Sequence, residues 1–215
     1  MVTANRRRQP KASARQRLLV AADDVFRREG FHGTDLRQVA RQAGVTTGAL
    51  YWSFQGKADL FLAVFDRNLA QRIDEVVALL QERDPTERNE RAVEEWFRRL
   101  GEQREWQRVL LEFRLHAARD PELNARFLER HRRFVEVAAQ GFAKPGRPPS
   151  RRIREIAVAF IALANGYALE HLNDPENITR EHHARAARWL LQSVIPAFAG
   201  AEPRRRQQAV SDAAS

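Results

Sequence analysis

The sequence predicts an all-helical protein, and two observations support this fold class. Apolar residues recur with helical spacing nearly everywhere, as at Leu18, Ala22 and Val25, and no segment keeps the apolar–polar alternation of a half-buried strand. Capping residues, glycines and prolines divide this pattern into segments of helical length. The elements are therefore expected to be helices throughout.

Capping residues define the helices of the first quarter of the chain. Ser13 is an expected N-cap, Gly30 ends the first helix where a left-handed residue is usually needed, and Thr34 is expected to cap the second helix. Gly44 then closes that second helix, and Lys57 opens a long one. The predicted helices cover residues 14–30, 35–43, 47–52 and 57–82.

Longer helices are expected beyond Pro85. Asp120 precedes Pro121, which places a cap before a proline at the first helical position, where its missing N–H costs nothing. Ser150 and Thr179 are expected to cap the last two helices. The predicted helices cover residues 86–101, 104–119, 121–142, 151–173 and 179–198.

The composition excludes several classes of protein. The chain has no cysteine, so disulfides and thiolate metal sites are excluded, and a cytoplasmic location is expected. The basic amino terminus lacks the uninterrupted apolar segment of an export signal. No apolar run reaches the roughly 18 residues of a membrane span, so no membrane partner is expected.

The positive charge is concentrated at the amino terminus. Residues 1–57 carry +7 of the net charge of +9, and the remaining chain is nearly balanced. This asymmetry favours a polyanion partner for the amino-terminal part, with nucleic acid ahead of a membrane surface. From charge alone, a basic stretch without any such partner is an equally good interpretation.

The stretch "TDLRQVARQAGVTTGALYWSF", residues 34–54, predicts a helix-turn-helix. Leu36 and Val39 give the first short helix an apolar face, Gly44 suits the turn, and Leu50 and Phe54 face inward from the second helix. Small residues at the start of that second helix would let it lie deep in a major groove. Its outward face carries Thr46, Thr47, Gly48, Ala49, Tyr51 and Ser53.

Residues 30–65, "GFHGTDLRQVARQAGVTTGALYWSFQGKADLFLAVF", resemble the DNA-binding domain of the TetR family of bacterial repressors, within a match of about residues 14–65. The resemblance implies a recognition helix lined by Thr46, Thr47, Gly48 and Ala49. It implies phosphate contacts from Thr34, Tyr51 and Lys57, and a base or phosphate contact from Arg37. Ser53 replaces the usual His or Tyr, so its phosphate contact would be shorter or bridged by water.

The resemblance, together with the charge of the amino terminus and the low apolar content of the carboxy terminus, divides the chain into four segments. Residues 1–13 form a basic arm, 14–65 the DNA-binding domain, 66–200 a helical domain for ligand binding and dimerisation, and 201–215 a disordered tail. Whether the basic side chains of the arm contact DNA or remain solvated stays open.

The larger domain shows no sign of catalysis. It contains no phosphate-binding loop, no paired histidines one helical turn apart and no nucleophile motif, so no catalytic residue, metal or cofactor is expected. Its aromatic stripes could be plain core, but the resemblance implies a cavity for a small, partly apolar effector. The candidate pocket residues are Trp96, Trp106, Leu110, Phe113, His116, Asn165, Tyr167 and His171.

The two final helices are apolar over more than one face, so each must bury a second face. The resemblance implies a homodimer in which that face meets a second copy, whereas a monomer would have to bury it within one chain. The candidate interface residues are Ile153, Phe160, Ile161, Trp189, Val194, Ile195 and Phe198.

Together these features predict a homodimeric transcriptional regulator, a repressor that a small effector releases from its double-stranded DNA operator. Two alternatives remain at this point: a constitutive DNA-binding protein without a ligand, and an enzyme that retains a vestigial helix-turn-helix.

Overall fold

The computed structural model describes residues 13–80, 104–143 and 146–189, and every regular element within them is an α-helix. The all-helical prediction is therefore confirmed for this part of the chain. Residues 1–12 of the basic arm, the predicted helix over 86–101 and the tail lie outside it. The helices are α1 (Ala14–Gly33), α2 (Leu36–Gln42), α3 (Thr47–Ser53), α4 (Lys57–Leu80), α6 (Arg104–Ala117), α7 (Pro121–Phe142), α8 (Arg151–Asn173) and α9 (Arg180–Trp189).

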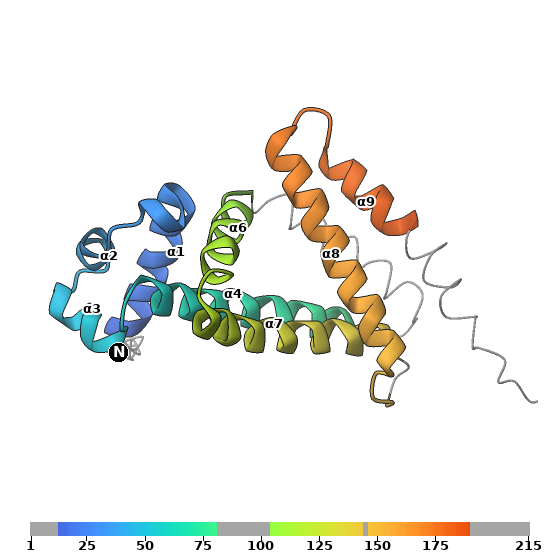
Figure 1. Cartoon of the computed structure of the whole chain (residues 1–215), viewed down its shortest axis with the longest axis horizontal. Coiled ribbons are helices and arrows are strands. Elements are labelled where there is room, and N and C mark those ends of the chain that lie inside the picture. Colours follow the sequence, from blue (N-terminus) through green and yellow to red (C-terminus); the bar gives the residue numbers. More distant parts are fainter. Residues whose placement is uncertain (1–12, 81–103, 144–145, 190–215) are drawn as a thin grey trace, which may run out of the picture.

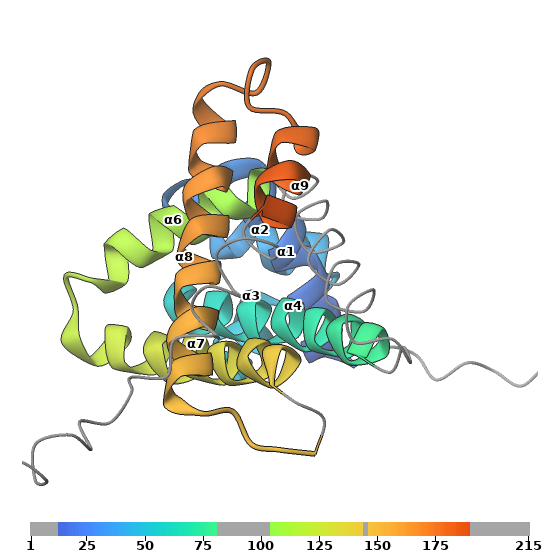
Figure 2. The ribbon, with the colours of Figure 1, turned by 90° about the vertical axis from the view of Figure 1, so that its right-hand side faces the viewer.

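The helices are arranged along one long axis (Figure 1). The three short helices α1, α2 and α3 gather at one end, and α8 and α9 lie at the other. The long helices α4 and α7 run side by side between the ends, and α6 stands between α1 and α8, in contact with both. Figure 2 shows the same arrangement from the end that carries α8 and α9.

The expected caps explain most helix boundaries. The Ser13 hydroxyl accepts from the Gln16 N–H at 3.1 Å while the Gln16 side chain accepts from the Ser13 N–H at 2.9 Å, a reciprocal capping box. Gly30 has φ of 78° and interrupts α1, as its left-handed role predicts. Asp120 accepts from two N–H groups at the start of α7, and Ser150 accepts from Ile153 at the start of α8.

One cap was assigned to the wrong residue. Asp35, not Thr34, is the N-cap of α2, because its carboxylate accepts from the Arg37 N–H at 2.9 Å. Thr34 instead ends α1, where its buried hydroxyl donates to the Gly30 carbonyl at 2.7 Å. Threonine and aspartate are both good capping residues, and here the threonine hydroxyl is already bonded to the carbonyl of Gly30, four residues earlier.

A single apolar core joins the short helices to the larger domain. Phe26 and Phe31 of α1 pack on Phe61 of α4, and Phe61 stacks on Phe113 of α6 with ring centroids 4.1 Å apart. Trp106 extends the stack, with its centroid 5.4 Å from that of Phe61. The predicted domain boundary between residues 65 and 66 therefore falls within the continuous helix α4 and beside a shared core.

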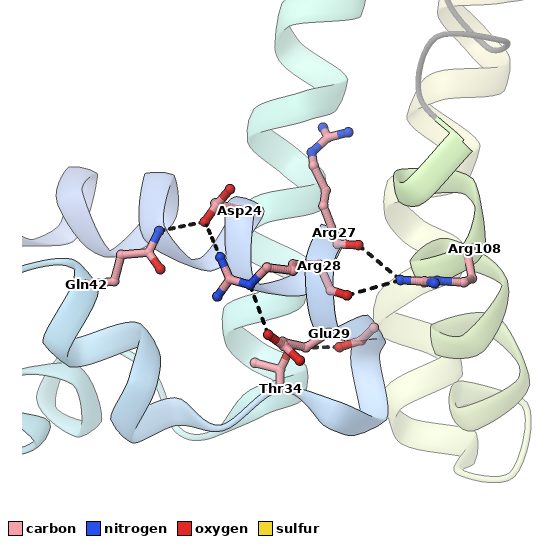
Figure 3. A network of polar contacts seen from close by, with 8 residues as sticks. Asp24, Arg27, Arg28, Glu29, Thr34, Gln42 and Arg108 are labelled. Atoms are coloured by element: carbon pink, nitrogen blue, oxygen red, sulfur yellow. Dashed lines mark hydrogen bonds and ion pairs between the residues drawn. The ribbon is translucent and has the colours of Figure 1, made fainter.

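A junction of polar groups fastens α6 to the end of α1 (Figure 3). The Arg108 guanidinium of α6 donates to the carbonyls of Arg27 at 3.1 Å and Arg28 at 3.4 Å. Glu112, one turn further, accepts from the N–H of Phe31 at 2.7 Å. The backbone carbonyls and N–H groups at a helix end lack partners within the helix. Where Gly30 interrupts α1, the side chains of α6 provide these hydrogen-bond partners.

Neither a membrane span nor a metal cluster occurs within the described residues. None of the helices there is long and apolar enough to cross a bilayer. No group of three or more histidine or acidic side chains in that part is placed to hold a metal ion.

Candidate nucleic-acid interface and adjoining pocket

The helix-turn-helix consists of α2, α3 and the turn between them. Gly44 takes φ of 64° in the turn, and its N–H donates to the Arg41 carbonyl at 3.1 Å. Ala40 and Leu50, both fully buried, lie on the facing sides of the two helices. The predicted inward faces are therefore confirmed, and the opposite face of α3 remains outside the core.

Side chains at the start of α3 are small and leave room in front of the helix. The Thr46 hydroxyl caps α3 by accepting from the Ala49 N–H at 3.2 Å, and it retains a hydrogen to donate outward. Thr47 and Ala49 are half-buried, and Gly48 is exposed. A Cβ added to Gly48 would meet only the Thr46 Oγ1, at 3.9 Å, so the fold of this chain does not require a glycine there.

Two aromatic side chains project from the same helix. Tyr51 is 56 % exposed, as expected for an outward residue. Trp52 is 88 % exposed, and it was not among the residues predicted from the sequence. It follows the inward Leu50 by two residues, or about 200° around a helix, and this angle places it opposite the core. A helical-wheel argument would have found it.

Three predicted contact residues have partners within the chain. The Thr34 side chain is buried, and the Ser53 hydroxyl donates to the Ala49 carbonyl at 3.0 Å. The Lys57 ammonium donates to the carbonyls of His32 at 2.8 Å and Thr34 at 2.9 Å, which leaves one hydrogen for an outside acceptor. Burial lowers the pKa of Lys57. Arg37 is exposed on α2.

Lys57 therefore has a structural role that the sequence did not reveal. Its two hydrogen bonds hold the chain between α1 and α2, and its ammonium lies 5.5 Å from the centre of the Phe31 ring. Replacing Lys57 with Ala is expected to lower stability as well as any phosphate contact, so this variant cannot isolate the phosphate contact.

Two adjoining pockets lie against α6. A cavity of about 40 Å³ lies among α4, α6, α7 and α8, and one of about 190 Å³ lies between α6 and α8. An engineered apolar cavity of about 150 Å³ binds benzene, so the larger pocket has room for a group of about that size. Both pockets are lined by Gln107, Leu110, Arg114 and Asn165.

The residues predicted for the effector pocket fall in different places in the structure. Trp106, Leu110 and Asn165 line a pocket, whereas Trp96 lies outside the described residues. Phe113 belongs to the aromatic core, and the exposed His116 packs against Phe31. Tyr167 packs against the smaller cluster between α7 and α8, and His171 Nδ1 lies 2.6 Å from the Ile178 carbonyl. None of these last four lines either pocket.

Charge in the pockets is one-sided. Arg114 lines both, and neither contains an Asp or a Glu among its described lining residues. Burial lowers the pKa of the Arg114 guanidinium. Burial, and next the charge of Arg114, lowers the pKa of His131 on the opposite wall. Neither residue was among those predicted from the sequence.

The lowered pKa of His131 predicts a dependence of stability on pH. The unfolded chain takes up the histidine proton near pH 6.5, and the folded chain does so only at lower pH, so stability falls as the pH drops through this interval. His131→Asn should flatten that part of the curve measured by urea unfolding at several pH values. Parallel curves for His131→Asn and the wild type would contradict the expected titration.

The predicted dimer residues lie in different environments. Phe160 and Ile161 are buried against α7 within their own chain, which corrects their assignment to the interface. Ile153 is half-buried, Trp189 is 63 % exposed, and Val194, Ile195 and Phe198 lie outside the described residues. The other face of α8 carries an exposed apolar stripe of Val158, Ala159, Ala162, Gly166 and Leu169.

An exposed helix-turn-helix on a bundle of longer helices defines a class of helical DNA-binding regulators. Sequence comparison gives the family. The profile described as bacterial regulatory proteins, tetR family, matches residues 18–64, and the profile of the tetracycline repressor-like C-terminal domain matches residues 84–197. The chain belongs to the TetR family, and it is a helix-turn-helix transcriptional regulator.

Several relatives are similar over different lengths. The transcriptional activator FasR of Mycolicibacterium smegmatis is 28% identical over 180 residues, which cover 82% of this chain and 81% of FasR. The regulator SrpR of Pseudomonas putida is 50% identical over 50 residues, 23% of this chain and 24% of SrpR. The similarity to SrpR is thus confined to about a quarter of each chain.

Solved structures share the fold. The regulator FadR of Bacillus subtilis, in complex with stearoyl-CoA, has a TM-score of 0.65 at 17% identity, covering 82% of this chain and 97% of FadR. A regulator from Saccharomonospora viridis, in complex with choline, has a TM-score of 0.68 at 21% identity, covering 84% of this chain and 96% of that one. The ligands of these two proteins differ in chemistry, so the fold does not specify the effector.

Proposed function

We propose that the protein is a cytoplasmic homodimer that binds a two-part DNA operator and is released from it by a small, partly apolar effector. The effector occupies the pockets beside α6. The observation that carries this proposal is the position of α6, which borders the pockets on one side and fastens the end of α1 on another.

Three faces of α6 connect the pockets to the DNA-binding helices. Leu110 and Arg114 face the pockets, Phe113 lies in the aromatic core, and Arg108 and Glu112 hold the end of α1. Because α1 packs against α2 and α3, a shift of α6 on effector binding would move the recognition helix. The recognition helices of the two copies would then no longer have the spacing of successive major grooves. The effector would thus shift the population from a DNA-binding state to a state that does not fit the operator.

The exposed stripe on α8 supports the homodimer. Val158 is 50 % exposed, and the smaller Ala159 and Ala162 lie beside it. Gly166 and Leu169 continue the stripe to the rim of the larger pocket, which they also line. A second copy would remove this apolar surface from water, and small residues allow two helices to approach closely. Trp189 of α9 adds a further exposed apolar side chain.

Activation is the second candidate for the direction of control. The relative FasR, similar over most of the chain, is named as an activator. A reporter fused to the regulated promoter separates the two: loss of the regulator should raise transcription for a repressor and lower it for an activator.

Footprinting on the DNA upstream of the protein's own gene tests the proposal, since such regulators commonly act on neighbouring genes. We expect protection of two inverted half-sites. A mixture of wild type with competing non-specific DNA should retain the footprint. Protection that disappears with competitor would contradict specific operator binding.

Tyr51→Phe is expected to weaken operator binding by roughly 3- to 10-fold, because one exposed hydroxyl contact to a phosphate is worth about 0.5–1.5 kcal/mol. The thermal midpoint should not change, because Tyr51 lies outside the core. Fluorescence anisotropy with labelled operator DNA measures the affinity. Tyr167→Phe, on α8, is the matched control and should bind DNA as the wild type does. Equal affinities for the wild type and Tyr51→Phe would argue against a hydroxyl–phosphate contact.

A further inference from the structure

The pocket beside α6 contains a half-buried positive charge, that of Arg114, without a counter-charge among the described residues. The Nε of Arg114 is buried and has no hydrogen-bond partner, the one such side-chain atom found in the described part of the chain. No ion pair of Arg114 occurs within that part either, although other arginines of α7 and α8 pair with acids at 2.6–3.0 Å. Arg114 thus differs from its neighbours in lacking an acid.

The surroundings of Arg114 make this arrangement costly. Its guanidinium carbon lies 5.5 Å from the centre of the Phe127 ring, a contact that offsets only part of the lost hydration. Arginine stays protonated in proteins, so the group cannot become neutral to avoid the cost. A buried charge without a partner lowers the stability of the folded chain. A ligand that brings the missing negative charge would remove this cost.

The remaining lining defines the rest of such a ligand. Leu110, Leu169 and Leu172 provide apolar walls in the larger pocket, and Trp106, Phe134 and Ile161 do so in the smaller one. The amides of Gln107 and Asn165 lie beside Arg114 in both pockets and offer further N–H donors. A charged head at Arg114 and an uncharged chain along the leucines would fit this distribution.

We propose that Arg114 binds the anionic head of an amphiphilic effector whose apolar chain lies along α6 and α8. This rests on the proposed function and names the chemical class of its effector: a carboxylate or a phosphate on an apolar chain. The planar guanidinium pairs with both heads through two parallel hydrogen bonds. Cationic amphiphiles are excluded by the same charge.

Isothermal titration of the full-length protein tests this with probes that share one chain. The probes are hexanoate, hexyl phosphate, hexan-1-ol and hexyltrimethylammonium, whose chains match the size of the pockets, each below its micelle concentration. The wild type is expected to bind at least one of the two anions roughly 10- to 100-fold more tightly than the alcohol, as charge-assisted hydrogen bonds imply, and not to bind the ammonium. The comparison of carboxylate with phosphate identifies the head group.

Arg114→Met isolates the guanidinium. This variant should lose the preference for the anion, while its affinity for the alcohol should stay within a factor of about two of the wild-type value. The control Arg132→Met, on the exposed side of α7, should bind all probes as the wild type does. The ligand-free Arg114→Met protein should also melt at a higher temperature than the wild type, because it no longer buries an unpaired charge. A purely structural arginine predicts the opposite change in melting temperature.

Several outcomes would overturn the inference. These are equal anion affinities in the wild type and Arg114→Met, tighter binding of the alcohol or the ammonium, and no binding of carboxylates from butanoate to decanoate. An operator titration in parallel separates this inference from the proposed function. Release of the operator by a neutral or cationic compound alone would leave the proposed function intact and end the inference.

Discussion

Ala162→Glu is expected to convert the protein to a monomer and to weaken operator binding by at least about 100-fold. Ala162 lies in the middle of the exposed apolar stripe on α8, which the proposed dimer buries. A carboxylate there would lose its hydration without gaining a partner. A dimer that binds both half-sites has an operator affinity about 10² to 10⁴ times that of a single half-site contact, because the second contact forms at a high effective concentration. A monomer loses this gain in affinity.

Sedimentation velocity beside an operator titration measures both effects of Ala162→Glu. Ala125→Glu introduces the same change at an exposed alanine of α7 and should leave both properties unchanged. Glutamate and alanine are both good helix formers, so helical content should survive in either variant. An Ala162→Glu protein that sediments and binds DNA as the wild type does would place the interface elsewhere.

Gly30→Ala is expected to destabilise the fold by about 2–4 kcal/mol, the largest stability effect among the described glycines. Gly30 has φ of 78° and ψ of 174°, a region that is nearly confined to glycine and costs other residues about 1–3 kcal/mol. An added Cβ would also lie 2.8 Å from both Glu112 carboxylate oxygens. Glu112 could move away only by giving up its bond to the Phe31 N–H.

Two other glycines separate the cost of backbone strain from the cost of the contact with Glu112. Gly44 has φ of 64° but nothing within 4 Å of an added Cβ, so Gly44→Ala should cost about 1 kcal/mol from the backbone alone. Gly56 has neither feature, and Gly56→Ala should be nearly neutral. Urea unfolding of the three variants ranks them. Equal losses for Gly30→Ala and Gly44→Ala would show that the contact with Glu112 adds nothing.

Local signals in the sequence predicted much of the fold. Gly30 and Gly44 both take the left-handed conformation expected of them, and Asp120 and Ser150 cap the expected helices. These features depend on a few consecutive residues. The N-cap of α2 shows the limit of such local prediction, because Asp35 caps this helix in place of the expected Thr34. The Thr34 hydroxyl bonds to the Gly30 carbonyl instead, and the residue types alone do not reveal this.

Contacts between distant helices were harder to predict. An apolar helix such as α8 has two apolar faces, and periodicity does not tell which one meets the same chain; Phe160 and Ile161 turned out to pack against α7. Arg114 did leave a signal, since it lies one helical turn after Leu110, which was among the predicted pocket residues. Its lack of an acidic partner depends on what α4, α7 and α8 bring near it, and this required the structure.

Selection of binding sites from a random DNA pool tests the central claim most directly, because the operator sequence need not be identified beforehand. The full-length wild type should enrich one sequence made of two inverted half-sites, centred about 10–10.5 base pairs apart or a multiple of that distance, as two recognition helices in a symmetric dimer require. Enrichment of a single half-site without its inverted copy, or no enrichment over many rounds, would contradict the account of the protein as a dimeric operator-binding regulator.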